Sequence, residues 1–263
     1  MKKVSEKELK KMQKNARKPA VLFSFDGAIM DTENAIMATY RHVFAVYNKE
    51  ITGNVSTEED LVRCDPEDIF IQYLPKADPE EALHEFNSYE HDHLIDLIRP
   101  MHGVQDLLIW LKENGYKVGI VSARERSDVV EYLRHTDIDA YIDVILGRSG
   151  YGATRTESIL TACQLMDADS CIFITDSARN LQSGAQAGTF NIGIVTKPER
   201  TEALVEAGAD FLTRDYKEIR KLMEGEPLWL AYTLTYPEEV QKQRVKKRKA
   251  EEKERKAEKK NKA

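Results

Sequence analysis

Short apolar runs alternate with segments of helical periodicity along most of the chain. The apolar runs have the length of strands buried on both faces, and several of them stop at turn residues such as Asp26-Gly27. Strands separated by helices in this way predict an α/β fold with a doubly wound parallel sheet. The predicted strands are 20–25, 117–121, 141–146, 171–175, 191–195 and 209–212, and helical patterns between them include 104–111, 157–166 and 181–187.

One long stretch, residues 34–97, breaks this alternation. It is helical in character, acidic and rich in aromatic residues, and it follows the first predicted strand directly. We therefore expect a small helical domain inserted into a core that consists of residues 19–33 and 98–223.

The composition fits a chain that buries a sizeable core. Its 263 residues are 41% hydrophobic, which suits one large domain or two small ones. No apolar run is long enough for a membrane span, and the lysine-rich start lacks the apolar segment of a signal peptide. Cys64, Cys163 and Cys171 have no CxxC spacing, so neither a zinc site nor a disulfide framework is indicated, and Cys163 and Cys171 are expected to face the core. We expect a reduced, cytoplasmic protein.

The formal charge of −6 is unevenly distributed. Residues 1–18 form a basic N-terminal extension and residues 238–263 a charged, basic tail, so the body between them is strongly acidic. This pattern favours solvated ends over a basic nucleic-acid face, although the tail leaves contact with RNA or an anionic lipid open. Residues 224–237 form an aromatic segment that we expect to pack on the core.

Polar side chains follow several of the predicted strands. Because ligands bind at the carboxyl ends of strands in an open parallel sheet, these side chains are candidates for one site. Two carboxylates with a hydroxyl suit Mg²⁺ and a phosphate group. The residues concerned are Asp26 and Asp31 after the first strand, Ser122, Arg124 and Arg126 after the second, and Thr175, Asp176 and Ser177 after the fourth.

At these positions the sequence resembles the haloacid dehalogenase (HAD) superfamily, in particular its phosphoglycolate-phosphatase and β-phosphoglucomutase-like branch. Residues 23–33 are similar to that family's DxDGTLxDT loop, 118–122 to its second motif and 173–180 to its GDSxxD loop, while 99–104 resemble the return from cap to core. The resemblance implies a Rossmann-like core, a helical cap at 34–97, and Mg²⁺-dependent hydrolysis of phosphate monoesters.

Four departures from the family pattern surround the implied site. Ser24 stands where the family has its nucleophilic aspartate, which also ligates Mg²⁺, and Ala28 replaces a threonine. The family's lysine is missing, with Arg155 nearest in sequence and Arg148 as an outside candidate. Asn180 replaces the second carboxylate of the metal loop.

The resemblance assigns roles to particular residues of this chain. A degraded site of this kind predicts a protein with weak or lost Mg²⁺ binding that acts by binding a small phosphorylated ligand or a partner. Two alternatives stay open: an active phosphomonoesterase of altered mechanism, and an RNA- or ribosome-associated protein acting through its basic ends. The oligomeric state is undetermined. The implied catalytic residues are Ser24, Asp26, Ser122 and Arg155, the phosphate-binding residues Gly27, Ser122, Ala123 and Arg155, and the metal ligands Asp26, Asp176 and Asn180.

Overall fold

The computed structural model describes residues 17–48, 61, 66–148 and 154–225. Several predicted features lie outside the described residues. These are most of the basic N-terminal extension, Cys64, nearly all of the aromatic segment, and the basic tail.

A parallel sheet forms the centre of the molecule. Its strands are β1 (Ala20–Ser24), β4 (Lys117–Val121), β5 (Val144–Leu146), β6 (Cys171–Thr175), β7 (Phe190–Ile194) and β8 (Phe211–Thr213). Their order across the sheet is β5-β4-β1-β6-β7-β8, and every neighbouring pair is parallel. The central strands β1 and β6 are buried along their whole length, as expected for strands covered on both faces. The predicted doubly wound α/β fold is confirmed.

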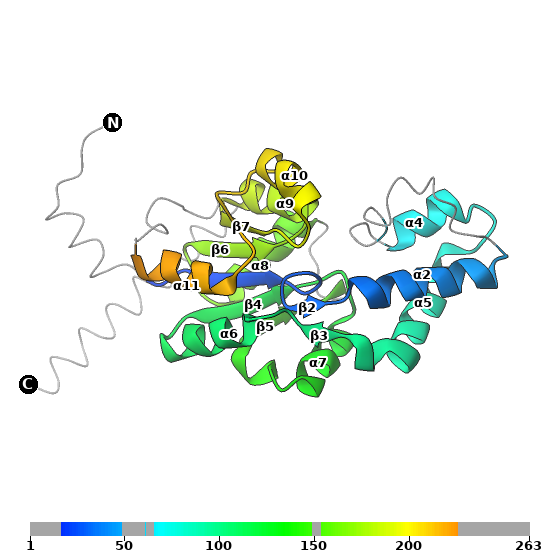
Figure 1. Ribbon diagram of the computed structural model, residues 1–263, viewed down its shortest axis with the longest axis horizontal. Coiled ribbons are helices and arrows are strands. Elements are labelled where there is room, and N and C mark those ends of the chain that lie inside the picture. Colours follow the sequence, from blue (N-terminus) through cyan, green and yellow to red (C-terminus); the bar gives the residue numbers. More distant parts are fainter. Residues whose placement is uncertain (1–16, 49–60, 62–65, 149–153, 226–263) are drawn as a thin grey trace, which may run out of the picture.

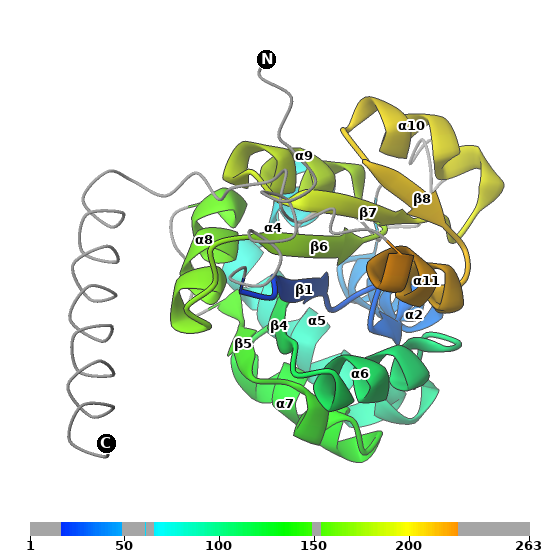
Figure 2. The ribbon, with the colours of Figure 1, turned by 90° about the vertical axis from the view of Figure 1, so that its left-hand side faces the viewer.

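Helices cover both faces of the sheet (Figure 2). On one face lie α6 (Val104–Glu113), α7 (Arg126–His135) and α11 (Tyr216–Gly225), and on the other α8 (Arg155–Leu165), α9 (Ala178–Ala187) and α10 (Thr201–Glu206). Alternate residues of β1 serve the two cores: Val21 and Phe23 pack on the first side, Ala20 and Leu22 on the second.

Two of the predicted strands begin later in the chain than expected. The first residue of the predicted strand 141–146, Tyr141, belongs to a short 3₁₀ helix, η2 (Asp139–Tyr141). Strand β5 itself begins at Val144. In the predicted strand 209–212, the N–H of Ala209 still donates to Leu204 O, closing the turn after α10. Gly208 makes that turn with a positive φ of 90°, so β8 starts at Phe211 and ends at Thr213.

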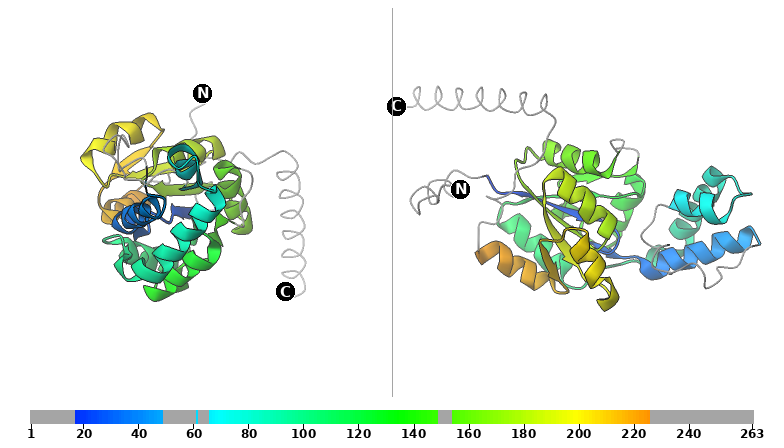
Figure 3. Two further views of the ribbon diagram at one scale, coloured as in Figure 1. Left: turned by 90° about the vertical axis from the view of Figure 1, so that its right-hand side faces the viewer. Right: turned by 90° about the horizontal axis from the view of Figure 1, so that it is seen from above.

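A helical unit projects from the sheet between β2 (Met30–Asp31) and β3 (Arg99–Pro100), which pair antiparallel (Figures 1 and 3). We call this unit the helical insertion; it contains α2 (Glu33–Val46), α4 (Pro66–Tyr73), α5 (Pro79–Leu94) and η1 (Ile95–Leu97). Asp78 caps the N-terminus of helix α5, because its side chain accepts from the N–H groups of Glu80 and Glu81.

The helical insertion has its own apolar core. Tyr40 lies at its centre, with ring centroids 4.9 Å from Phe86 and 5.8 Å from Phe70. This core is separate from the core of the sheet, against which the insertion packs Ala35 of α2 and the partly buried Tyr89 of α5.

The two described cysteines, Cys163 and Cys171, are buried as free thiols, as predicted. Burial raises the pKa of the Cys171 thiol well above its ordinary value, and the neighbouring Cys163 adds to this effect. Within the described part of the chain, no helix has the combination of length and apolar character that crossing a membrane requires.

Candidate functional site

The sheet order brings three of the polar strand ends together. Strand β1 lies between β4 and β6, and Ser24 at its carboxyl end is level with Val121 of β4. Ser122 therefore follows beside Ser24, and Asp176 follows the end of β6 on the other side of the loop after β1. The candidate site is this shared edge.

The loop after β1 lies against Asp176. Gly27 adopts a positive φ of 71°, and a Cβ on this residue would overlap the Asp176 carboxylate. The hydroxyl of Ser24 is buried and donates to the backbone oxygen of Asp26 at 3.3 Å. A glycine is required at position 27 both for its backbone conformation and for this close approach.

Asp26 has one oxygen that accepts three hydrogen bonds. Thr32 Oγ1 donates to Asp26 Oδ1 at 2.8 Å, and Arg124 donates to the same atom through Nε at 2.9 Å and Nη2 at 2.8 Å. The side chain of Arg124 is 12% exposed and that of Asp26 is 26% exposed. The Arg124 guanidinium thus lies inside the candidate site, next to a residue that the sequence predicts to be catalytic.

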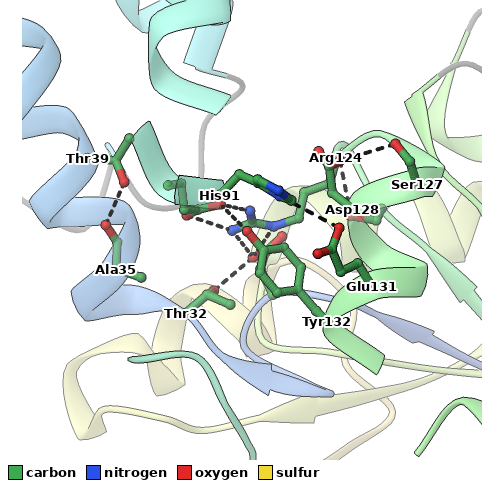
Figure 4. A network of polar contacts seen from close by, with 12 residues as sticks. Thr32, Ala35, Thr39, His91, Arg124, Ser127, Asp128, Glu131 and Tyr132 are labelled. Atoms are coloured by element: carbon green, nitrogen blue, oxygen red, sulfur yellow. Dashed lines mark hydrogen bonds and ion pairs between the residues drawn. The ribbon is translucent and has the colours of Figure 1, made fainter. Parts of the chain in front are cut away.

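Arg124 also contacts Glu90 of α5, in the helical insertion. Figure 4 shows the polar network of this region, with Arg124 and Tyr132 labelled. Arg124 Nη2 donates to Glu90 Oε1 at 3.2 Å and Arg124 Nη1 to Glu90 Oε2, while the Tyr132 hydroxyl donates to Oε2 at 3.4 Å. Burial acts to lower the pKa of Arg124, but Asp26 and Glu90 outweigh it, and the pKa lies well above its usual value. Burial and the Glu90 carboxylate likewise raise the pKa of Tyr132. The arginine is therefore a permanent cation bridging sheet and insertion.

A second arginine lies at the other retained carboxylate. Arg200, in the 3₁₀ helix η4 (Pro198–Arg200), places Nη1 3.7 Å from Asp176 Oδ2 and Nη2 3.2 Å from Glu33 Oε2. Both Arg200 and Asp176 are buried. Lys197 also pairs with Glu33 at the start of α2. Each retained carboxylate of the candidate site thus has a guanidinium group beside it.

The remaining predicted site residues lie in the surrounding loops. Ser122 Oγ accepts from the N–H of Arg124 at 3.1 Å, so its hydroxyl helps to shape the loop after β4. Arg148 donates from Nε to Ala123 O at 2.9 Å, which places this outside candidate against the same loop. Arg155 is the first residue of α8, whose N-terminus is closed by the capping box of Thr154 and Glu157. Its predicted role in phosphate binding stays a prediction.

Asn180 turns toward its own loop. Its Nδ2 donates to Thr175 Oγ1 at 3.3 Å, and its backbone N–H donates to the N-cap Ser177 at 3.4 Å. An amide that donates in this way offers its oxygen elsewhere, but it carries no charge with which to bind a metal ion.

The donor set fits Mg²⁺ poorly. This ion is usually held by carboxylate oxygens, yet Asp26 and Asp176 both contact guanidinium groups and Ser24 contributes a neutral hydroxyl. Over the described ranges, no group of three or more His, Cys, Asp or Glu side chains is arranged to hold a metal. We therefore derive no step through a metal ion.

Three features of the site were not predicted from the sequence. The sequence placed Arg124 at a strand end, but its contact with Asp26 was not foreseen. The burial of Glu90 could have been predicted, because this residue continues the buried stripe of α5 formed by Ala82 and Phe86. Arg200 lies far from every motif and carried no signal.

The comparisons with known proteins identify the family. A doubly wound sheet with a helical insertion after its first strand, and Ser and Asp side chains at adjacent strand ends, defines an α/β protein of the hydrolase type that the sequence resembles. The profile of the haloacid dehalogenase-like hydrolase family matches residues 21–194, so the chain belongs to this family. Hydrolases of the HAD superfamily generally use Mg²⁺.

Among curated proteins, the chain is similar to the pyrophosphatase PpaX of several bacteria. It is 27% identical to the Bacillus cereus protein over 175 residues, 64% of this chain and 79% of the relative. It is 24% identical to the Listeria welshimeri protein over 212 residues, 78% of this chain and 96% of the relative.

Solved structures share the fold at lower identity. A haloacid dehalogenase-like hydrolase from Streptococcus pneumoniae superposes with a TM-score of 0.70 at 19% identity, covering 78% of this chain and 98% of the other. A putative β-phosphoglucomutase from Thermotoga maritima gives 0.61 at 22% identity, covering 79% and 99%. A putative phosphoglycolate phosphatase from Lactobacillus plantarum gives 0.69 at 18% identity, covering 79% and 100%. The neighbours thus include proteins of the predicted branch.

Proposed function

We propose that this chain has lost efficient phosphoester hydrolysis and acts by binding a small phosphorylated ligand between the sheet and the helical insertion, which serves as its cap. The observation that carries the proposal is the Arg124 guanidinium bound to Asp26 beside a serine at position 24. A cation and a neutral hydroxyl replace the anionic cluster that would attack phosphorus and ligate a metal ion.

The chemistry of Ser24 supports the loss of turnover. A carboxylate that attacks phosphorus forms an acyl-phosphate, a mixed anhydride that water cleaves readily. The Ser24 hydroxyl would form an ordinary phosphate ester, and spontaneous hydrolysis of such esters is among the slowest reactions known. We expect a rate loss of about 10⁴–10⁶-fold, as seen when a nucleophile is removed from other enzymes.

The surroundings of Asp176 support weak or lost Mg²⁺ binding. Its carboxylate has the buried Arg200 guanidinium 3.7 Å away, and that positive charge opposes a divalent cation at the same oxygens. Asn180 is neutral as well, so this loop provides little binding free energy for Mg²⁺.

The same changes leave a set of hydrogen-bond donors suited to a phosphate group. Ser24 and Ser122 supply hydroxyls at adjacent strand ends, beside the loop that contains Gly27. Arg124 contributes a fixed guanidinium, whose planar donors match phosphate oxygens. A site of this kind holds a phosphate monoester without cleaving it.

A second candidate function is hydrolysis by an altered mechanism. It is favoured by the similarity to proteins named pyrophosphatases and by the retention of Asp26, which could activate a water molecule directly. This candidate requires Asp26 to exchange its contact with Arg124 for one with water.

Phosphorus NMR separates the two candidates in one sample. Phosphoglycolate is incubated with the purified full chain and Mg²⁺, and its resonance is followed together with that of inorganic phosphate. The proposal predicts a protein-dependent shift or broadening of the phosphoglycolate signal with no inorganic phosphate above the protein-free control. Accumulation of inorganic phosphate in proportion to the protein would overturn it in favour of hydrolysis.

A further inference from the structure

The sheet side holds Arg124 in place through several independent contacts. Asp26 Oδ1 accepts from its Nε and Nη2, and the guanidinium carbon lies 5.6 Å from the ring centroids of both Phe25 and Tyr132. The backbone is held as well, because the N–H of Arg148 donates to Arg124 O at 2.7 Å. The orientation of this arginine is therefore set without the helical insertion.

The outer edge of the guanidinium is occupied by Glu90 of α5. Two nitrogens of Arg124 meet the two oxygens of the Glu90 carboxylate, the forked geometry in which arginine binds planar anions. The Glu90 side chain is 3% exposed, so it fills this position to the near exclusion of water. An anion is thus already bound at the arginine, and it belongs to the protein.

Glu90 and Arg124 lie on different units of the molecule. Glu90 belongs to the helical insertion, which joins the sheet through the short β2–β3 pair. By contrast, Asp26 and Phe25 belong to the loop after β1, and Tyr132 belongs to α7 on the sheet. A displacement of the insertion would carry Glu90 away and leave Arg124 oriented. Asp26 would stay bound to Nε and Nη2, but Nη1 would lose its acceptor. A buried donor without an acceptor is costly, so another anion would be favoured in the place of Glu90.

We propose that the outer edge of Arg124 is a phosphate subsite, and that Glu90 occupies it as an internal competitor until the phosphate group of a ligand displaces it. Ligand binding is then coupled to movement of the helical insertion away from this contact. The inference rests on the proposed function. It adds Arg124 as the residue that binds the phosphate group and Glu90 as the residue that lowers the affinity for phosphate.

The site predicts how affinity responds when the competitor is neutralised. Glu90→Gln keeps the shape and a hydrogen-bond acceptor but removes the charge, so the ligand-competent arrangement becomes more populated. Glu131→Gln is a matched control, because Glu131 makes another contact between sheet side and insertion, at 3.8 Å from His91, and loses the same charge. The Glu131→Gln substitution leaves the contacts of Arg124 unchanged.

The test is calorimetric titration of inorganic phosphate into the wild type, Glu90→Gln, Glu131→Gln and the double variant Glu90→Gln/Arg124→Gln, each checked for folding by circular dichroism. We expect Glu90→Gln to bind phosphate at least about tenfold more tightly than the wild type. Glu131→Gln should match the wild type, and the double variant, in which the facing pair is neutral, should lose the gain.

The failures are distinguishable. Equal phosphate affinity in the wild type and Glu90→Gln would overturn the competition by Glu90 and leave the proposed ligand binding intact. A gain that survives in the double variant would overturn the assignment of Arg124. Absence of phosphate binding in every folded variant would overturn the phosphate-binding function itself, and the subsite with it.

Discussion

Arg124 donates two hydrogen bonds to a single oxygen of Asp26, through Nε at 2.9 Å and Nη2 at 2.8 Å. This pairing joins the loop after β4 to the loop after β1, and the same guanidinium continues to Glu90 on the helical insertion. Two carboxylates from distant parts of the chain therefore depend on one buried cation.

Removal of that cation is expected to destabilise the fold strongly. Arg124→Gln leaves Asp26 and Glu90 close together without a counter-charge, which typically costs about 3–5 kcal/mol of unfolding free energy. Urea unfolding followed by circular dichroism measures this loss. Arg179→Gln is the control, because Arg179 and Asp68 form an exposed pair at 3.8 Å that is worth less than about 1 kcal/mol. Similar losses in both variants would contradict the role given to Arg124.

Restoring the family's carboxylate should recover part of the metal affinity. Ser24→Asp places a third carboxylate beside Asp26 and Asp176, so Mg²⁺ should raise the thermal midpoint of this variant by mass action. Ser24→Asn has nearly the same shape without the charge and should not respond. Calorimetric titration with Mg²⁺ checks the difference directly. If the aspartate and asparagine variants behave alike, the neighbouring guanidinium groups or Asn180 prevent binding even with the carboxylate restored.

The approach of the β1 loop to Asp176 can be tested at Gly27. Gly27→Ala suffers both a positive φ of 71° and overlap of the new Cβ with the Asp176 carboxylate. Gly115→Ala has nearly the same φ, 69°, but its Cβ meets open space. We expect Gly115→Ala to cost about 1–2 kcal/mol and Gly27→Ala to cost at least about 2 kcal/mol more. Equal unfolding free energies would show that the loop does not lie against Asp176.

Asp143 is expected to link stability to pH. Burial tends to raise the pKa of its carboxyl, but hydrogen bonds from Lys112 and the Val118 N–H, at 2.8 Å each, outweigh it, and the pKa lies below its ordinary value of 3.8. A carboxyl with a lowered pKa stabilises the fold fully above its unfolded-state value. That contribution disappears as the pH falls from near 3.8 through the folded-state pKa.

The measurement for Asp143 is the unfolding free energy of Asp143→Asn and the wild type across a series of pH values. We expect a difference of about 1–3 kcal/mol near neutral pH, which narrows as the pH approaches and passes below the ordinary carboxyl pKa. Asp139→Asn, at an exposed side chain 3.8 Å from Arg134, controls for the change in net charge. A difference that stays constant into the acid range would contradict the assigned contacts.

The sheet and its strand ends were predictable because their signals are local. Strands such as β1 and β6 are apolar throughout and stop at polar turns, so their burial on both faces is visible in the sequence. The carboxyl ends of parallel strands share an edge, which placed Asp26, Ser122 and Asp176 in one site before the strand order was known, while Ser24 was added by the family resemblance.

The arginines that complete the site were not predictable in the same way. The pairs Arg124–Glu90 and Arg200–Asp176 join residues from separate elements, and their geometry depends on how the helical insertion and η4 pack on the sheet. No spacing along the chain encodes such packing. The strand boundary at Phe211 was missed for a more local reason, because the turn at Gly208 continues past the apolar Ala209.

The rate of phosphate release tests the central claim most directly. The wild type and Asp26→Asn are incubated separately with pyrophosphate and with p-nitrophenyl phosphate in the presence of Mg²⁺, and inorganic phosphate is measured over time. Since Ser24 cannot form an acyl-phosphate and Asp26 is bound by Arg124, we predict the same background rate for both proteins. Release by the wild type that exceeds the Asp26→Asn rate by orders of magnitude would contradict the account.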